Sequence, residues 1–149
     1  MRRLVVAALV MCAMLAHGES VMASDVSQMQ RKDDSGDARA AFHLGRLYRN
    51  GIGVAADSKR AFQLIESAAL KRHPPAMLIL SNMLASGEAG RADQAAARSW
   101  LEGAADLDYP EALQQLALVL HAGAMGYSAD PVRSALLFRK AAHAMKHRH

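Results

Sequence analysis

The 149-residue sequence is poor in aromatic residues, has one cysteine and contains no long apolar run. Aromatics make up 5% of the chain although 52% of its residues are hydrophobic, because alanine and methionine supply much of the apolar content. This composition favours closely packed helices over a β-sheet, which is rich in branched and aromatic residues. The length suits one domain. The net charge of +4 is too small to make nucleic acid the expected partner.

The longest apolar run covers residues 4–16 and follows a pair of arginines. Its thirteen residues fall short of the roughly 20 that a membrane-spanning helix needs. Small residues come after it, and this order is typical of a secretory signal peptide at residues 1–23. Cleavage after Ala23 or after Gly18 fits the pattern, and we favour Ala23. Retention of the segment as a membrane anchor is the alternative.

The only cysteine, Cys12, lies inside this segment. It follows Met11 rather than the small residue of a lipoprotein signal, so we expect no lipid anchor and a mature chain without disulfides or thiol chemistry. Without residues 1–23, which hold two arginines and one glutamate, 16 Lys and Arg stand against 13 Asp and Glu, for a net charge of +3. We expect a periplasmic or secreted protein. Residues 24–36 are polar and aperiodic, which predicts a flexible linker.

From residue 37 onward the sequence repeats with a period of 36, and the third copy carries one extra residue in its loop. The equivalent residues are Ala40, Ala76 and Ala112; Leu44, Leu80 and Leu116; Gly51, Gly87 and Gly123; Asp57, Asp93 and Asp130; Leu64, Trp100 and Leu137; and Ala68, Ala104 and Ala141. Such a period is the signature of a repeat architecture. It predicts a helical repeat domain over 37–149, with repeats at about 37–72, 73–108 and 109–146.

Each copy is predicted to form a helix, a loop and a second helix. In copy one, apolar residues recur every three or four positions from Ala40 to Tyr48, as on one face of a helix. Gly51 can adopt the left-handed conformation that ends a helix, and Asp57 can cap the next one. The glycine-rich loop at 50–57 therefore reads as a turn, since it lacks the lysine and the preceding strand of a phosphate site. The last helix is predicted at roughly 131–146.

The second helices carry pairs of alanines that allow close helix packing, such as Ala68 with Ala69. Glu66 and Glu102 are equivalent positions in successive repeats rather than an acid/base pair, and copy three has Arg139 there. Trp100 fills an apolar position of the repeat, which predicts core packing rather than ligand stacking.

The pattern of copy one resembles the Sel1-like repeat (SLR), a relative of the tetratricopeptide repeat. The matching residues are Ala40, Leu44, Gly45, Tyr48, Gly51, Gly53, Val54, Asp57, Arg60, Ala61, Leu64, Ala68 and Ala69. Copies two and three depart from it: Gly45 becomes Ser81 and Ala117, and the glycine that usually follows the alanine pair is Arg72 or Asp108. The resemblance implies an all-α fold, a right-handed α-α superhelix (solenoid) of about three helix-loop-helix repeats, whose stability comes from stacking.

The resemblance also implies a scaffold that binds a protein or peptide in a concave groove lined by the first helices. The groove positions are Arg39, Phe42, Arg46 and Arg49 in copy one, Leu78 and Asn82 in copy two, and Gln114, Leu118 and His121 in copy three. The arginines are either a solvated helix face or a cluster that favours an extended or acidic segment of a partner. We expect no nucleic-acid partner and no stable membrane insertion after cleavage.

Motifs of enzymes are missing, including S-x-x-K, G-x-S-x-G and H-E-x-x-H. We therefore expect no catalytic residue and no cofactor. The alternative is a cell-wall-related or β-lactam-binding or -hydrolysing protein, as reported for exported members of the family, although those are cysteine-rich. His143 and His147 have the i, i+4 spacing of metal ligands, with His149 beyond. They lack an acidic or cysteine companion, so incidental affinity rather than a functional metal is expected.

Overall fold

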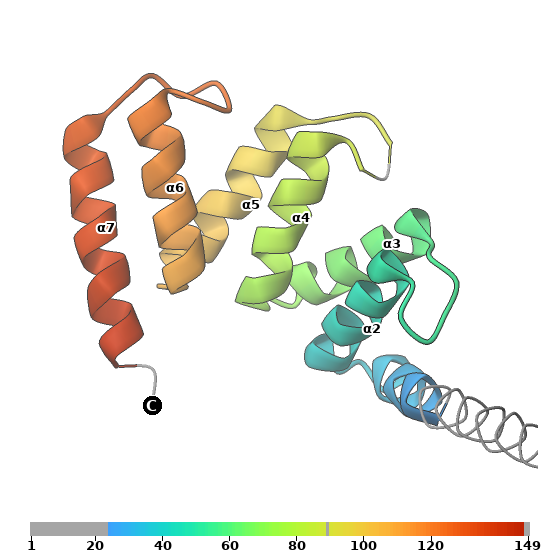
Figure 1. Cartoon of the computed structure of the whole chain (residues 1–149). Coiled ribbons are helices and arrows are strands. Elements are labelled where there is room, and N and C mark those ends of the chain that lie inside the picture. The colour runs from blue at the N-terminus through green and yellow to red at the C-terminus, as the bar shows by residue number, and fades with distance from the viewer. Residues whose placement is uncertain (1–23, 89, 148–149) are drawn as a thin grey trace, which may run out of the picture.

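The computed structural model describes residues 24–88 and 90–147, and these residues contain helices, turns and loops but no strand. The predicted signal peptide at 1–23, with Cys12, lies outside the described residues, and so does His149. Six helices follow the described N-terminal segment: α2 (Ala38–Asn50), α3 (Ser58–Leu70), α4 (Pro74–Ser86), α5 (Gln94–Asp106), α6 (Pro110–Ala122) and α7 (Pro131–Lys146). They form three antiparallel pairs set in a row, so the predicted all-α solenoid is confirmed (Figure 1).

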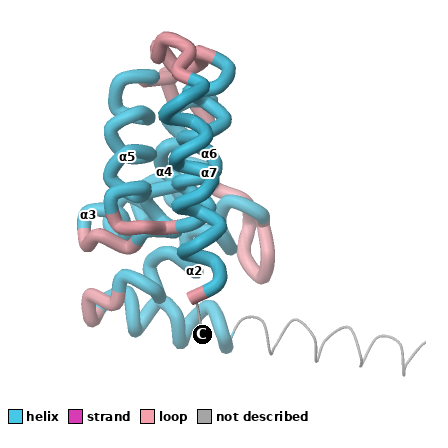
Figure 2. The backbone as a smooth tube through the Cα atoms, turned by 90° about the vertical axis from the view of Figure 1, so that its left-hand side faces the viewer, coloured by secondary structure: helices cyan, strands magenta, loops and turns pink. Residues whose placement is uncertain are grey.

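The main contacts join helices that are consecutive in the chain, from α2 with α3 to α6 with α7. Figure 2 looks along the same row from the α7 end, with α6 and α7 nearest the viewer. A structure built in this way has no central core that all its elements share, and each helix pair is stable only because its neighbours cover it. One cluster of buried side chains nevertheless runs continuously from α2 to α7.

The loops within the three repeats close in the same way. Gly51 ends α2 with a φ of 65°, and Gly87 and Gly123 repeat this left-handed conformation after α4 and α6. The backbone N–H of Asp57 then donates to the carbonyl of Tyr48 at 2.9 Å, while its side chain caps α3. Equivalent loop bonds are Asp93 to Leu84 at 2.9 Å and Asp130 to Leu120 at 2.8 Å. The prediction that each loop is a helix stop, a turn and a helix start is confirmed.

The second helices end without glycine. Arg72 after α3 and Asp108 after α5 have φ values of 59° and 56°, although side chains disfavour this region. Each donates its N–H back to the helix, Arg72 to Ala69 at 2.9 Å and Asp108 to Ala105 at 3.0 Å. The backbone geometry of the repeat is thus kept where the family's glycine has been lost.

The alanine pairs lie where helices pack, as the sequence predicts. Ala68 and Ala104 are fully buried, and Ala141 is buried in the same way on α7. Ala142 is exposed, because no further helix follows α7 among the described residues. Trp100 is partly buried against the core cluster, in agreement with the packing role predicted for it.

Residues 24–34 form a helix, which corrects the flexible linker predicted for 24–36. The sequence shows no apolar period there. Within the helix, Gln30 Nε2 donates to Asp34 Oδ1 at 3.3 Å, a side-chain pair four residues apart that gives a helix modest support. Gly36, with a φ of 87°, ends it. The Nζ of Lys71 donates to the carbonyl of Gly36 at 3.0 Å and joins this helix to the end of α3.

Candidate functional site

Four of the nine predicted groove residues line one cavity between α2 and α4. The cavity has a volume of about 330 Å³, and the start of α6 contributes to its wall. Its lining residues are Phe42, Arg46, Arg49, Asn50, Pro75, Leu78, Ile79 and Tyr109. The repeat produces this arrangement because equivalent faces of successive first helices lie next to each other, with the apolar side chains of α4 opposite the arginines of α2.

Phe42 and Arg46 form a stacked pair one helical turn apart. Phe42 is buried, and the guanidinium carbon of Arg46 lies 5.8 Å from the centre of its ring. The exposed Arg46 has no ion-pair partner within the part of the chain that the structure describes. A cation over an aromatic face keeps its charge while its position is fixed. Arg46 is therefore a positioned positive charge at a cavity that combines apolar and polar lining residues.

His73 packs against the Phe42 ring in a tilted arrangement, with 5.1 Å between the ring centres. Partial burial lowers the pKa of His73 below its ordinary value, and the charges of Arg39 and His43 lower it further, against a weaker opposing effect of Asp37. The imidazole is therefore neutral at pH 7. It contacts Phe42 but is not itself one of the residues that line the cavity.

Arg49 forms an ion pair with another residue of the fold. Its guanidinium binds Glu88, which follows α4, in a two-bond ion pair with distances of 2.7 and 2.6 Å. This hydrogen-bonded partner raises the pKa of Arg49. The pair connects α2 to the loop of the second repeat and neutralises one of the three arginines expected to face a partner. Of those three charges, only Arg39 and Arg46 remain without an ion-pair partner in the described residues.

The other predicted residues do not reach the cavity. Asn82 of α4 accepts a hydrogen bond from Gln115 of α6 at 2.5 Å, so it serves helix packing. Arg39, Gln114, Leu118 and His121 are exposed on α2 and α6, and Leu118 is 58% exposed. Sequence reasoning missed Tyr109. It stands 36 residues after His73, immediately before a helix-opening proline, so the repeat register was the signal that could have found it.

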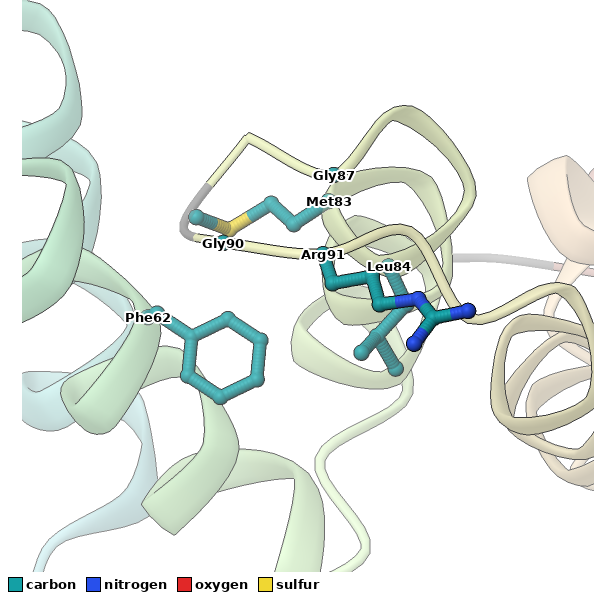
Figure 3. Close-up of a pocket in the computed structure, with 6 residues that line it drawn as sticks. All are labelled: Phe62, Met83, Leu84, Gly87, Gly90 and Arg91. Atoms are coloured by element: carbon teal, nitrogen blue, oxygen red, sulfur yellow. The ribbon is translucent and has the colours of Figure 1, made fainter.

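A second, smaller cavity of about 170 Å³ lies between α3 and the loop after α4. Figure 3 shows Phe62 of α3 facing Met83 and Leu84 of α4, with Gly87, Gly90 and Arg91 along the loop above them. None of the predicted groove residues lines it. Its walls are mainly apolar, and the close approach of the loop backbone to Gly87 makes it a packing gap under a turn.

His143 of α7 and His147 just after it have no third potential metal ligand beside them among the described residues. The rings of His143 and His147 lie 4.5 Å apart. No group of three His, Cys, Asp or Glu side chains within residues 24–88 and 90–147 is placed to hold a metal ion. The described helices also include none that is both long and apolar enough to cross a membrane.

Comparison with known proteins gives consistent matches. The family model described as Sel1 repeat matches residues 38–73, 74–109 and 110–144. The structure of a protective antigen of uropathogenic Escherichia coli strains that displays an SLR fold is similar with a TM-score of 0.75 and 25% identity, over 81% of this chain and 26% of that one. A Sel1 repeat protein from Oxalobacter formigenes is similar with a TM-score of 0.73 and 27% identity, over 78% of this chain and 46% of that one. The chain thus spans less than half the length of either protein.

Proposed function

Because the chain belongs to the Sel1 repeat family, whose helical scaffolds generally mediate protein interactions, we propose that it is an exported scaffold that binds a protein or peptide through its first helices. The observation that carries this proposal is the cavity between α2 and α4, where Arg46 is held over Phe42 above an apolar wall. Binding sites typically combine apolar surface with a few placed polar groups, and this cavity offers both.

The chemistry of the cavity indicates the kind of segment that fits. Leu78, Ile79 and Pro75 offer apolar surface, and Arg46 offers a charge that a carboxylate can pair with. Burying one apolar side chain there contributes about 1.5–3 kcal/mol, which by itself gives only weak binding. An extended partner segment that continues along α6, past Gln114, Leu118 and His121, would add the contacts that useful affinity requires.

The test uses a photo-crosslinking amino acid in place of Leu78, in the envelope of the source organism, with the same group in place of Arg60 on α3 as control. We expect a discrete partner to be crosslinked from Leu78 only. Arg46→Glu should abolish the crosslink, and Arg60→Glu, an equal change of charge outside the cavity, should not. Arg49 is left unchanged because Glu at this position would oppose Glu88. Crosslinks of equal yield from both positions would reject the cavity as the binding site.

Export is supported by the order of charged, apolar and small residues in segment 1–23. The mass of the protein isolated from the envelope tests it, and we expect a chain that begins at Ser24, or at Glu19 if cleavage follows Gly18. A full-length chain in the membrane fraction would support the anchor instead. Turnover of a chromogenic β-lactam by the purified protein, lost in Arg46→Glu, would contradict a scaffold without catalysis.

A further inference from the structure

Helix α7 exposes an apolar stripe at the end of the solenoid. Ala135, Phe138, Ala142 and Met145, here called the terminal face, are spaced by three, four and three residues and therefore lie on one side of the helix. All four are exposed, with Phe138 at 39% and Met145 at 40%. Figure 1 shows α7 as the last helix of the row, with α6 packed on its other side.

Two of these four residues, Phe138 and Ala142, have equivalents that are buried in the other repeats. Phe138 corresponds to Ile65 and Leu101, which are both 0% exposed. Ala142 likewise corresponds to the buried Ala69 and Ala105. Those positions lie on α3 and α5, onto which α4 and α6 pack. At Phe138 and Ala142 the terminal face therefore matches the helix-receiving surfaces inside the stack, but it is uncovered among the described residues.

The charge around the terminal face differs from that of the covered faces. Arg139 and Lys146 border it, and α7 as a whole contains no Asp or Glu. The residues equivalent to Arg139 are Glu66 and Glu102, so the sign of the charge is reversed at this position in the third repeat. Lys140 on the same helix is already paired with Asp108, at 2.5 Å. The open border of the terminal face is thus basic.

We infer that the terminal face binds an amphipathic helix of a partner protein, with an apolar stripe for Phe138 and Ala142 and acidic residues opposite Arg139 and Lys146. The internal contacts of α3 with α4 and of α5 with α6 show that a helix fits such a surface, and the small Ala142 allows its backbone to come close. A second copy meeting α7 with its own α7 is disfavoured, because two basic borders would then face each other.

The test needs no knowledge of the natural partner. Two fluorescent amphipathic helical peptides serve as probes; they share one Leu/Ala stripe and differ only in having glutamates or lysines along its borders. We expect the purified protein to bind the glutamate peptide at least about tenfold more tightly than the lysine peptide in fluorescence anisotropy. Vesicles of phosphatidylglycerol, an anionic membrane, are tested in parallel by sedimentation.

Three variants locate the binding. Ala142→Gln adds bulk at an exposed position and should weaken binding of the glutamate peptide at least about tenfold, while Arg139→Glu should remove the preference between the peptides. Leu136→Gln is the matched control, because Leu136 is 53% exposed on the same helix but outside the stripe, and Gln63 is its equivalent in the first repeat. It should leave binding unchanged. All three change exposed residues, and circular dichroism checks that each variant is folded.

Equal affinity for the two peptides, or an effect of Leu136→Gln as large as that of Ala142→Gln, would overturn the proposal. A second result would also overturn it: the protein binds neither peptide but binds the vesicles, and Ala142→Gln abolishes the vesicle binding. The terminal face would then bind a membrane. Arg46→Glu should not change peptide binding at all. The terminal face and the cavity between α2 and α4 can therefore fail independently.

Discussion

The first two repeats join their paired helices differently at the same crossing point. In the first repeat, Gly45 of α2 lies so close to α3 that an added Cβ would come within 2.7 Å of Cγ1 of Ile65 and 3.2 Å of the carbonyl oxygen of Ala61. In the second repeat, the equivalent Ser81 is fully buried on α4. Its hydroxyl donates to the carbonyl of Ala97 on α5, the equivalent of Ala61, at 2.7 Å.

The third repeat reverses the bond of the second. Ser134 of α7 donates its hydroxyl to the carbonyl of Ala117 on α6 at 2.8 Å, so the donor is now on the second helix. The three repeats thus make the same helix contact in three ways. The first packs closely on a glycine, the second uses a buried hydroxyl on its first helix, and the third uses a buried hydroxyl on its second helix. No buried side-chain polar atom in the described residues lacks a hydrogen-bond partner, so neither hydroxyl carries an unmet desolvation cost. In the third repeat the loss of the glycine comes with a matching substitution across the helix pair, Ala117 with Ser134, whereas in the second repeat the partner Ala97 is the same residue type as Ala61.

The largest effect is expected from giving the first repeat the residue of the second. Gly45→Ser places a Cβ against Ile65 and the backbone of α3, and overpacking of this kind costs about 2 kcal/mol of the free energy of unfolding. Urea denaturation followed by circular dichroism measures it. His43→Ser, at an exposed position of the same helix, is the control and should cost only a few tenths of a kcal/mol, roughly. Equal stability of Gly45→Ser and the wild type would show that α2 and α3 can separate without loss.

The reversed hydrogen bond can be tested by moving the hydroxyl across the helix pair. Ser81→Ala removes a buried bond and should lower the free energy of unfolding by about 1 kcal/mol. Adding Ala97→Ser to that variant recreates the order of the third repeat in the second, and we expect it to restore part of the loss. A double variant less stable than Ser81→Ala would mean that α4 and α5 cannot accommodate the donor on α5.

A smaller gain is expected where the second helix ends in a left-handed residue other than glycine. Arg72→Gly relieves the strain of a φ of 59°, and after the larger backbone entropy of glycine in the unfolded chain is subtracted, about 0.5 kcal/mol of stabilisation remains. Thermal denaturation measures it. Arg72→Ala removes the same side chain without freeing the backbone and should not stabilise the protein. If both variants gain equally, the side chain rather than φ is responsible.

The fold could be predicted because the same residue pattern occurs in all three repeats, so each helix boundary is marked three times in the sequence. Residues such as Gly51 and Asp57 recur with their spacing, and each marks a helix end or start for a simple steric or capping reason. The final helix, predicted at roughly 131–146, is observed at Pro131–Lys146 for the same reason. The helix at 24–34 lies outside the repeat, has no apolar period and could not be found in this way.

The candidate site was predictable only in part. The family resemblance assigned Phe42, Arg46 and Leu78 to one groove, and the structure brings them to one cavity. The pairing of Arg49 with Glu88 depends on the path of a loop 39 residues away, which no local pattern specifies. An arginine on a helix face reads the same in sequence whether its charge is free or neutralised.

The smallest effect is expected on the pH dependence of stability when His73 is replaced by tyrosine. His73 precedes α4, and Tyr109 precedes α6 in the equivalent position. Because burial lowers the pKa of His73 in the folded protein, the unfolded chain takes up its proton first as the pH falls below about 6.5. The folded state then loses stability relative to the unfolded chain, whereas above that pH the histidine is neutral in both states and contributes no pH dependence. His73→Tyr gives the second repeat the residue of the third and should reduce the loss of stability between neutral and mildly acidic pH. Melting temperatures of both proteins across this range measure the difference, and parallel curves would show that the Phe42–His73 contact does not depend on a neutral imidazole.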